Sequence, residues 1–160
     1  MSFPNPVNEN AARVVAGGVA VLALITLATG WLWLIVLLAV GFAARVVGGP
    51  RFSLLGRVAS QGIAPRLGRP RWVPGPPKRF AQGIGLVLTT VAAVGGLVLG
   101  LDGLALGLVA VLLVFATLES VLGFCAGCWL FGLLMTAGAI PADTCAACND
   151  VRARYGASSV

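Results

Sequence analysis

The sequence predicts an all-α, polytopic membrane protein built from two helical hairpins, with four transmembrane helices and a broken or re-entrant C-terminal helix. Of its 160 residues, 59% are hydrophobic and only 10% are charged, whereas roughly 25% of the residues in a soluble domain are charged. Several apolar runs approach the ~20 residues that a helix needs to cross a bilayer core. The runs come in pairs divided by very short connections, which predicts antiparallel hairpins.

The runs and their flanks define the predicted organisation of the chain. Residues 1–11 are expected to be a cytoplasmic tail, because they are polar and lack the basic start and cleavage site of a signal peptide. Residues 12–47 form the first transmembrane hairpin, with its outer turn at Gly30. Residues 81–122 form the second, with Asp102 in its outer turn. Because lipid offers no hydrogen bonds to the backbone, each apolar run is expected to be a helix.

The two hairpins resemble each other, which suggests an internal repeat. "ARVVAGGVAVL" at 12–22 and "KRFAQGIGLVL" at 78–88 each place an arginine just before a helix rich in small residues. Arg13 then corresponds to Arg79. A duplication of this kind predicts a two-fold pseudosymmetry axis along the membrane normal. The alternative is that the likeness reflects only the composition common to membrane helices.

Between the hairpins, residues 48–80 form a basic loop without a single acidic residue. By the positive-inside rule this loop and both termini face the cytoplasm, so topology explains the basic pI better than a nucleic-acid ligand does. Its prolines, including Pro76 and Pro77, are expected to keep most of it extended, although "FSLLGRVASQGIA" could be an amphipathic helix on anionic headgroups. The residues expected to contact anionic lipid or a partner are Arg51, Arg57, Arg66, Arg69, Arg71, Lys78 and Arg79.

The last apolar run is too long for one crossing. From Leu104 to Ile140 the chain has one charged residue, and as a single helix this run would be about 55 Å long against a ~30 Å core. Gly123 and Gly127 are the predicted site of a break. Residues 123–140 would then lie in the interface, re-enter the bilayer or pack against the bundle, and 141–160 would be a cytoplasmic tail. A fifth crossing is the alternative, and it would need a turn at "LESV" instead.

The one charged residue in that run is Glu119, which falls at or just inside the cytoplasmic boundary. Carboxylates at this depth are costly and are usually paired or functional. Arg45, near the inner end of the first hairpin, is the predicted partner in an ion pair that would lock the two hairpins together. A role for Glu119 as proton acceptor for nearby thiols is the functional alternative.

All four cysteines belong to two C-x-x-C pairs. Cys125 and Cys128 lie at the predicted break, where one thiolate could attack a substrate and the other could resolve the mixed disulfide. Simple packing of small apolar side chains is an alternative for this pair. The spacing of all four, Cys125, Cys128, Cys145 and Cys148, also fits a zinc site of four thiolates. No cofactor is favoured, and zinc stays the alternative because the sixteen residues between the pairs are mostly apolar.

Several motifs together resemble a known family. "PRLGRP", then "PPKRFAQGIGLVL", then "GFCAGC" over roughly residues 7–135 resemble the bacterial membrane family catalogued as domain of unknown function 4395. The resemblance implies a four-helix protein with a cysteine-bearing end, and hence a bacterial inner membrane. It also implies sulfur or redox work with a thioredoxin-like protein or a sulfurtransferase as partner. "CAAC" at 145–148 lies outside the family pattern.

Three functions are therefore open, and whether the protein is an enzyme is not decided by its sequence. The first is thiol redox chemistry or sulfane-sulfur handling at the cytoplasmic face through Cys125 and Cys128. The second is transport of a sulfur oxyanion, for which four helices would need to form a homo-oligomer. The third is an accessory or assembly subunit whose bundle and basic loop dock on a larger membrane complex.

Overall fold

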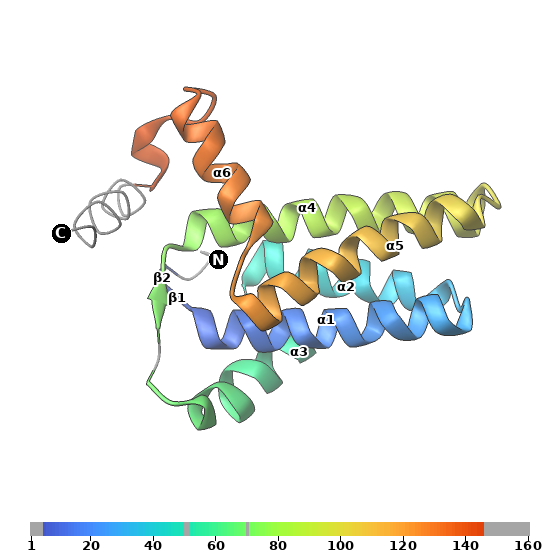
Figure 1. Cartoon of the computed structure of the whole chain (residues 1–160), viewed down its shortest axis with the longest axis horizontal. Helices are drawn as coiled ribbons and strands as arrows, with labels where there is room; N and C mark the ends of the chain where they lie inside the picture. The colour runs from blue at the N-terminus through green and yellow to red at the C-terminus, as the bar shows by residue number, and fades with distance from the viewer. Residues whose placement is uncertain (1–4, 50–51, 70, 146–160) are drawn as a thin grey trace.

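The computed structural model describes residues 5–49, 52–69 and 71–145, and these form an elongated helical bundle with smaller helices at one end (Figure 1). Two helical hairpins make the bundle, as predicted. Their helices are α1 (Glu9–Thr29) with α2 (Trp33–Gly48), and α4 (Gly75–Ala93) with α5 (Asp102–Thr117). The last two each continue as a π-helical turn, η4 (Val94–Val98) and η5 (Leu118–Leu122).

Three of the helices are long and apolar enough to cross a membrane. They are Glu9–Thr29, Gly75–Val98 and Asp102–Leu122. Helix α2 and the later helix α6 (Ala126–Thr136) are apolar but shorter. Large apolar side chains such as Leu37, Val87 and Val114 are more than half exposed on the outside of the bundle, as suits a lipid-facing surface.

The hairpins pack in a pattern that the predicted two-fold symmetry would require. The main contacts between hairpins are those of α2 with α4 and of α1 with α5, and these two pairings exchange when the hairpins are swapped. Arg13, at the start of α1, donates to the carbonyl oxygens of Ser120 and Val121 at the end of η5. Arg79, at the corresponding place in α4, donates to the carbonyl oxygen of Val46 near the end of α2.

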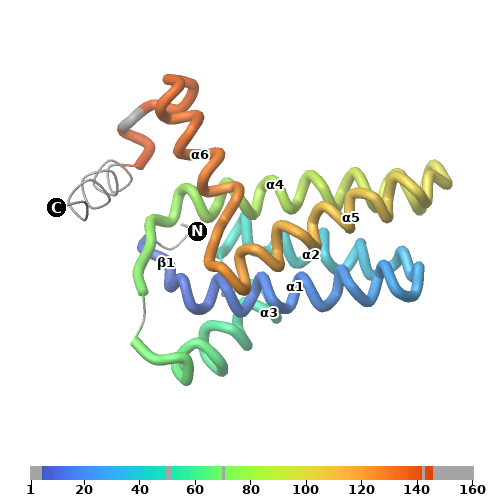
Figure 2. The backbone as a smooth tube through the Cα atoms, viewed as in Figure 1, coloured from blue at the N-terminus to red at the C-terminus, as the bar shows by residue number. Residues whose placement is uncertain are grey.

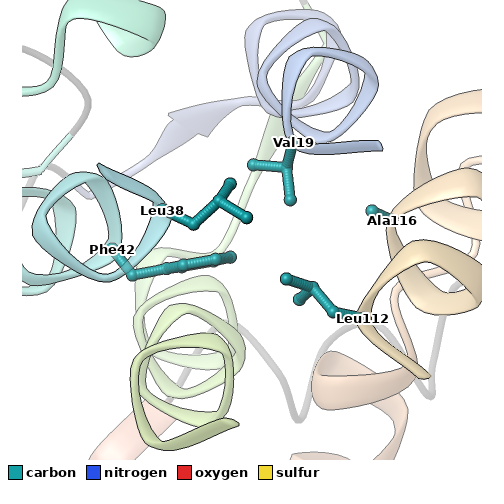
Figure 3. Close-up of a cluster of buried hydrophobic side chains, with 5 residues drawn as sticks. All are labelled: Val19, Leu38, Phe42, Leu112 and Ala116. Carbon is teal, nitrogen blue, oxygen red and sulfur yellow. The ribbon is translucent and has the colours of Figure 1, made fainter. Parts of the chain in front are cut away.

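The core of the bundle is formed by apolar side chains from α1, α2 and α5 (Figure 3). One buried cluster consists of Val19, Leu38, Phe42, Leu112 and Ala116. Helix α4 approaches this cluster through Gly85, where a β-carbon would collide with the Phe42 ring. Glycine at this position therefore lets α4 lie close to α2, as small residues do between membrane helices.

The basic loop is more ordered than the sequence suggests. It contains α3 (Leu54–Arg57), η2 (Val58–Ile63) and η3 (Ala64–Leu67), so the predicted amphipathic helix forms. A two-residue antiparallel ladder joins β1 (Val7–Asn8) to β2 (Trp72–Val73). The expectation that the prolines keep most of the loop extended is wrong at Pro76 and Pro77, which lie in the first turn of α4. Proline suits this turn because its missing N–H would have no helical partner there.

The long C-terminal apolar run breaks where the sequence predicts. Helical structure continues through "LESV" and stops at Gly123, whose φ of 69° is left-handed. The turn at "LESV" that a fifth crossing would need does not form. Helix α6 then leads away from the bundle axis (Figure 2), and its first half packs on α4, with the rings of Phe131 and Phe80 edge to face at 5.6 Å. The short helix η6 (Ala142–Cys145) ends the described residues.

Candidate functional site

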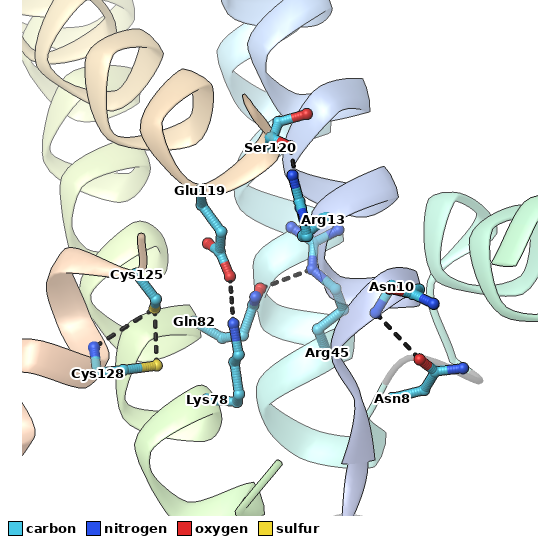
Figure 4. A network of polar contacts seen from close by, with 10 residues as sticks. All are labelled: Asn8, Asn10, Arg13, Arg45, Lys78, Gln82, Glu119, Ser120, Cys125 and Cys128. Carbon is cyan, nitrogen blue, oxygen red and sulfur yellow. Dashed lines mark hydrogen bonds and ion pairs between the residues drawn. The ribbon is translucent and has the colours of Figure 1, made fainter. Parts of the chain in front are cut away.

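Charged and thiol side chains from four helices meet at the end of the bundle where α1 and α4 begin (Figure 4). Lys78 comes from the first turn of α4 and Glu119 from η5, while Arg45 comes from the last turn of α2. Cys125 and Cys128 follow the break after η5. The site therefore depends on both hairpins and on the fold of the break.

Glu119 forms an ion pair with Lys78 and not with Arg45, so the predicted partner is wrong. The Lys78 Nζ atom lies 2.6 Å from Glu119 Oε1, and both side chains are largely buried, with 9% and 16% exposed. Lys78 was expected among the residues that contact lipid headgroups or a partner, but the start of α4 at Gly75 places it inside the bundle end. The predicted lock between the hairpins is replaced by a bond between α4 and η5, which are parts of the same hairpin.

Arg45 is held by neutral groups instead. Its Nε donates to Gln82 Oε1 at 2.7 Å and its Nη1 to Ser53 Oγ at 3.1 Å. Its guanidinium carbon lies 4.5 Å from the centre of the Phe42 ring. The residue is only 2% exposed, and among the described residues Nη2 has no hydrogen-bond partner. Arg45 thus presents a buried cationic donor without an acidic partner.

Cys125 is the N-cap of α6, and the geometry of this cap brings the two thiols together. Its sulfur accepts the backbone N–H of Cys128 at 3.4 Å, as an N-cap side chain does. The Cys128 Sγ donates to the Cys125 Sγ at 2.7 Å, so a bond of the ~2.05 Å disulfide length needs movement of less than an ångström. The positive end of the α6 dipole also lies at Cys125, which favours a thiolate there.

The same contacts separate the acidities of the two thiols. The hydrogen bond from Cys128 lowers the pKa of Cys125, helped by the positive charge of Lys78 and opposed by burial and by Glu119. The pKa of Cys128 is raised, first because its proton is held in that hydrogen bond and then because the thiol is buried. Cys125 is therefore the thiolate that can attack, and Cys128 keeps its proton until it resolves.

A cavity of about 450 Å³ opens beside the thiols, between the bundle and α6. Its polar end includes Arg45, Gln82, Glu119 and Cys125, and its remaining walls are apolar. A volume of this size is within the range of small-molecule sites, roughly 300–1,000 Å³. The thiol pair therefore faces a space that could hold a substrate.

The other predicted site residues lie apart from this cluster. Arg57, Arg66, Arg69, Arg71 and Arg79 are exposed on the basic loop and the start of α4, and Arg71 pairs with Glu9 at 3.3 Å. Arg51 lies outside the described residues.

The alternative zinc set is not assembled within the described part of the chain. Cys145 is disulfide-bonded, which removes it as a free thiolate ligand. Cys148 lies outside the described residues. Among those that the structure describes, no three His, Cys, Asp or Glu side chains gather where they could hold a metal ion.

The sequence analysis missed Gln82 and Ser53, and it placed Lys78 in the wrong environment. Lys78 follows two prolines, and a Pro-Pro pair before an apolar run is a signal for a helix start. A helix begun at Gly75 places Lys78 in its first turn, at the same end of the bundle as Glu119. No comparable signal marks Gln82 or Ser53, since their contacts with Arg45 depend on how α2, α4 and the basic loop pack.

Comparison with known proteins supports the family resemblance. Residues 7–136 match the model of a family described as Domain of unknown function (DUF4395). The matched region includes the bundle, the basic loop and the Cys125–Cys128 pair, and it ends with Thr136, the last residue of α6. No significant match was found among curated proteins or among solved structures.

Proposed function

The chain belongs to the family described as Domain of unknown function (DUF4395), and we propose that it carries out dithiol–disulfide exchange at the cytoplasmic face of the bacterial inner membrane. The observation that carries the proposal is the cap geometry, in which Cys128 donates to Cys125 at 2.7 Å at the start of α6. This arrangement provides an attacking thiolate with a resolving thiol beside it.

The proposed topology follows from charge and length. Helix α2 serves as the fourth crossing, because its 16 residues rise about 24 Å and Trp31 and Leu32 precede it. The basic loop faces the cytoplasm, together with the starts of α1 and α4. The thiols then lie at the cytoplasmic boundary, where α6 is interfacial or re-entrant, and a thioredoxin-like protein is the proposed soluble partner.

The reaction that this site supports is a two-step exchange. The Cys125 thiolate attacks the disulfide of the partner, one partner thiolate leaves, and a mixed disulfide forms. Cys128 loses its proton and attacks Cys125, which releases the second partner thiolate and closes the Cys125–Cys128 disulfide. In the reverse direction a reduced partner returns two electrons to the pair.

The test uses the full chain in membranes or detergent with Cys145 and Cys148 changed to serine, so that only the candidate pair reports. The reduced protein is incubated with an oxidised thioredoxin-like protein, and free thiols are counted by alkylation and mass shift. We expect both thiols to disappear together. Cys128→Ser should trap a mixed disulfide at Cys125, and Cys125→Ser should trap little or none.

Two results would contradict the proposal. Thiols that keep one state under every redox condition would exclude exchange, and uptake of labelled thiosulfate by reconstituted vesicles would then favour the anion-transport alternative. Equal trapping by Cys128→Ser and Cys125→Ser would show that the cap geometry does not select the attacking thiol.

A further inference from the structure

The cavity beside the thiols has an apolar body and one polar end. Side chains from α4, α5 and α6 line the body, among them Leu88, Leu112, Phe115, Trp129 and Leu130. Phe115, Trp129 and Leu130 are also between 36% and 60% exposed, so these walls continue onto the outer surface of the bundle. A lipophilic molecule could therefore enter from the bilayer side.

The polar end offers a hydrogen-bond donor that the protein itself does not use. Lys78 is already paired with Glu119, and Arg45 uses Nε and Nη1 for Gln82 and Ser53. Arg45 Nη2 is buried with no partner among the described residues, and Arg45 lines the cavity. An unsatisfied buried donor is costly, by about 1–3 kcal/mol or more for a charged group. The site is thus suited to a ligand with an acceptor oxygen at one end.

We propose that this cavity binds a lipid-soluble quinone, which takes electrons from the Cys125–Cys128 dithiol. A quinone has an apolar ring and tail for the body of the cavity and a carbonyl oxygen for Arg45. Negative charge develops on that oxygen during reduction, and the guanidinium stabilises it. Cys125 lines the same cavity, which places the electron donor beside the acceptor. A fatty acid would fit the walls and the arginine but would give the thiols nothing to reduce.

The electron and proton count of the step is balanced. The Cys125 thiolate and the Cys128 thiol form an S–S bond, and the S–H bond of Cys128 breaks. Two electrons pass to the quinone, whose two carbonyl oxygens take up the Cys128 proton and one proton from water to give the hydroquinone. This inference rests on the proposed exchange function, since a reduced soluble dithiol protein must then regenerate the pair.

Binding is tested separately from chemistry. The Cys125→Ser/Cys128→Ser protein in detergent is titrated with a decyl-substituted benzoquinone, and quenching of tryptophan fluorescence is measured with Trp129→Phe as the control for signal from the cavity. We expect saturable quenching that depends on Trp129. Arg45→Gln should weaken binding roughly ten- to a hundredfold, since one hydrogen bond to a charged group is lost.

A matched pair of variants keeps the test independent of Arg45, which also supports the fold. Leu88→Trp fills the cavity, whereas Val87→Trp adds the same bulk on an exposed face of the same helix. We expect Leu88→Trp to abolish quinone binding and Val87→Trp to leave it unchanged. Equal binding in both variants would overturn the proposal.

Chemistry is then measured with the reduced protein that keeps both cysteines. We expect one quinone reduced for each disulfide formed, seen as loss of quinone absorbance and loss of alkylatable thiol. If the thiols exchange with a thioredoxin-like protein but no quinone is reduced, the quinone inference fails and the exchange function stands. If the thiols never change state, the exchange function fails, whatever the quinone titration shows. Dodecanoate that displaces the quinone, with no quinone reduced, would identify a fatty-acid site.

Discussion

The inner ends of α2 and α5 differ in one informative way. Each ends at a glycine with positive φ, Gly49 at 74° and Gly123 at 69°. The N–H of each glycine bonds to the carbonyl oxygen four residues earlier, that of Arg45 or of Glu119. Arginine from the start of the other hairpin binds near both ends. The two ends therefore share a scaffold.

Beyond the glycines the ends diverge. Gly49 leads into the basic loop, whereas Gly123 leads to the cysteine cap of α6. Arg45 and Glu119 occupy equivalent places, yet Arg45 bonds to neutral groups and Glu119 to a lysine. A common backbone frame has thus been given a chemical site on one side only. What distinguishes that side is the short sequence that follows the helix end.

The largest effect is expected from breaking the ion pair that belongs to the second end. Glu119→Gln leaves Lys78 buried without an opposite charge, and we expect a loss of about 3–5 kcal/mol in the free energy of unfolding. Unfolding in mixed detergent micelles measures it. Combining Glu119→Gln with Lys78→Met should restore most of the loss, because no charge is then left unpaired. A double variant as unstable as the single one would contradict the pair.

A smaller effect is expected where α6 rests on α4. A β-carbon at Gly127 would lie 2.6 Å from the Ala81 β-carbon and 2.7 Å from its α-carbon, so Gly127→Ala must push α6 away. We expect a loss of about 1–3 kcal/mol in unfolding free energy and faster alkylation of both thiols. Gly132→Ala, on the same helix with nothing within 4 Å, is the matched control. It should be neutral or stabilising by up to about 1 kcal/mol.

The arginines compare the two ends directly. Arg13→Gln removes the donors to Ser120 and Val121, and we expect it to cost about 1–2 kcal/mol and to speed alkylation of Cys125 because the break loosens. Arg79→Gln acts at the end of α2, and it should change stability without changing the rate of alkylation. The rate is followed by mass shift over time. The same acceleration in both variants would mean that the ends are not independent.

Which parts of this comparison are visible in the sequence depends on the range of the interactions. The helices, the break and the thiols at the bundle end follow from run lengths and glycines, which are local signals. The start of α4 was placed too late because Pro76 and Pro77 were read as loop residues. The partner of Glu119 could not be predicted, because Arg45 and Lys78 are both basic and lie at the same end. Side-chain reach and the path of the basic loop to Ser53 decide between them.

The smallest effect concerns the acidity of the thiols, and it has no counterpart at the first end. Since the hydrogen bond from Cys128 is the main cause of the lowered pKa of Cys125, Cys128→Ala should raise that pKa. The alkylation rate of Cys125 would then reach its plateau at higher pH than in Cys128→Ser, where a hydroxyl can still donate. The rate is measured against pH in both variants, with Cys145 and Cys148 changed to serine. At a pH below the plateau we expect Cys128→Ala to react several-fold more slowly, because less thiolate is present. Coincident profiles would assign the lowered pKa to Lys78 and the α6 dipole, and Lys78→Met would then shift both.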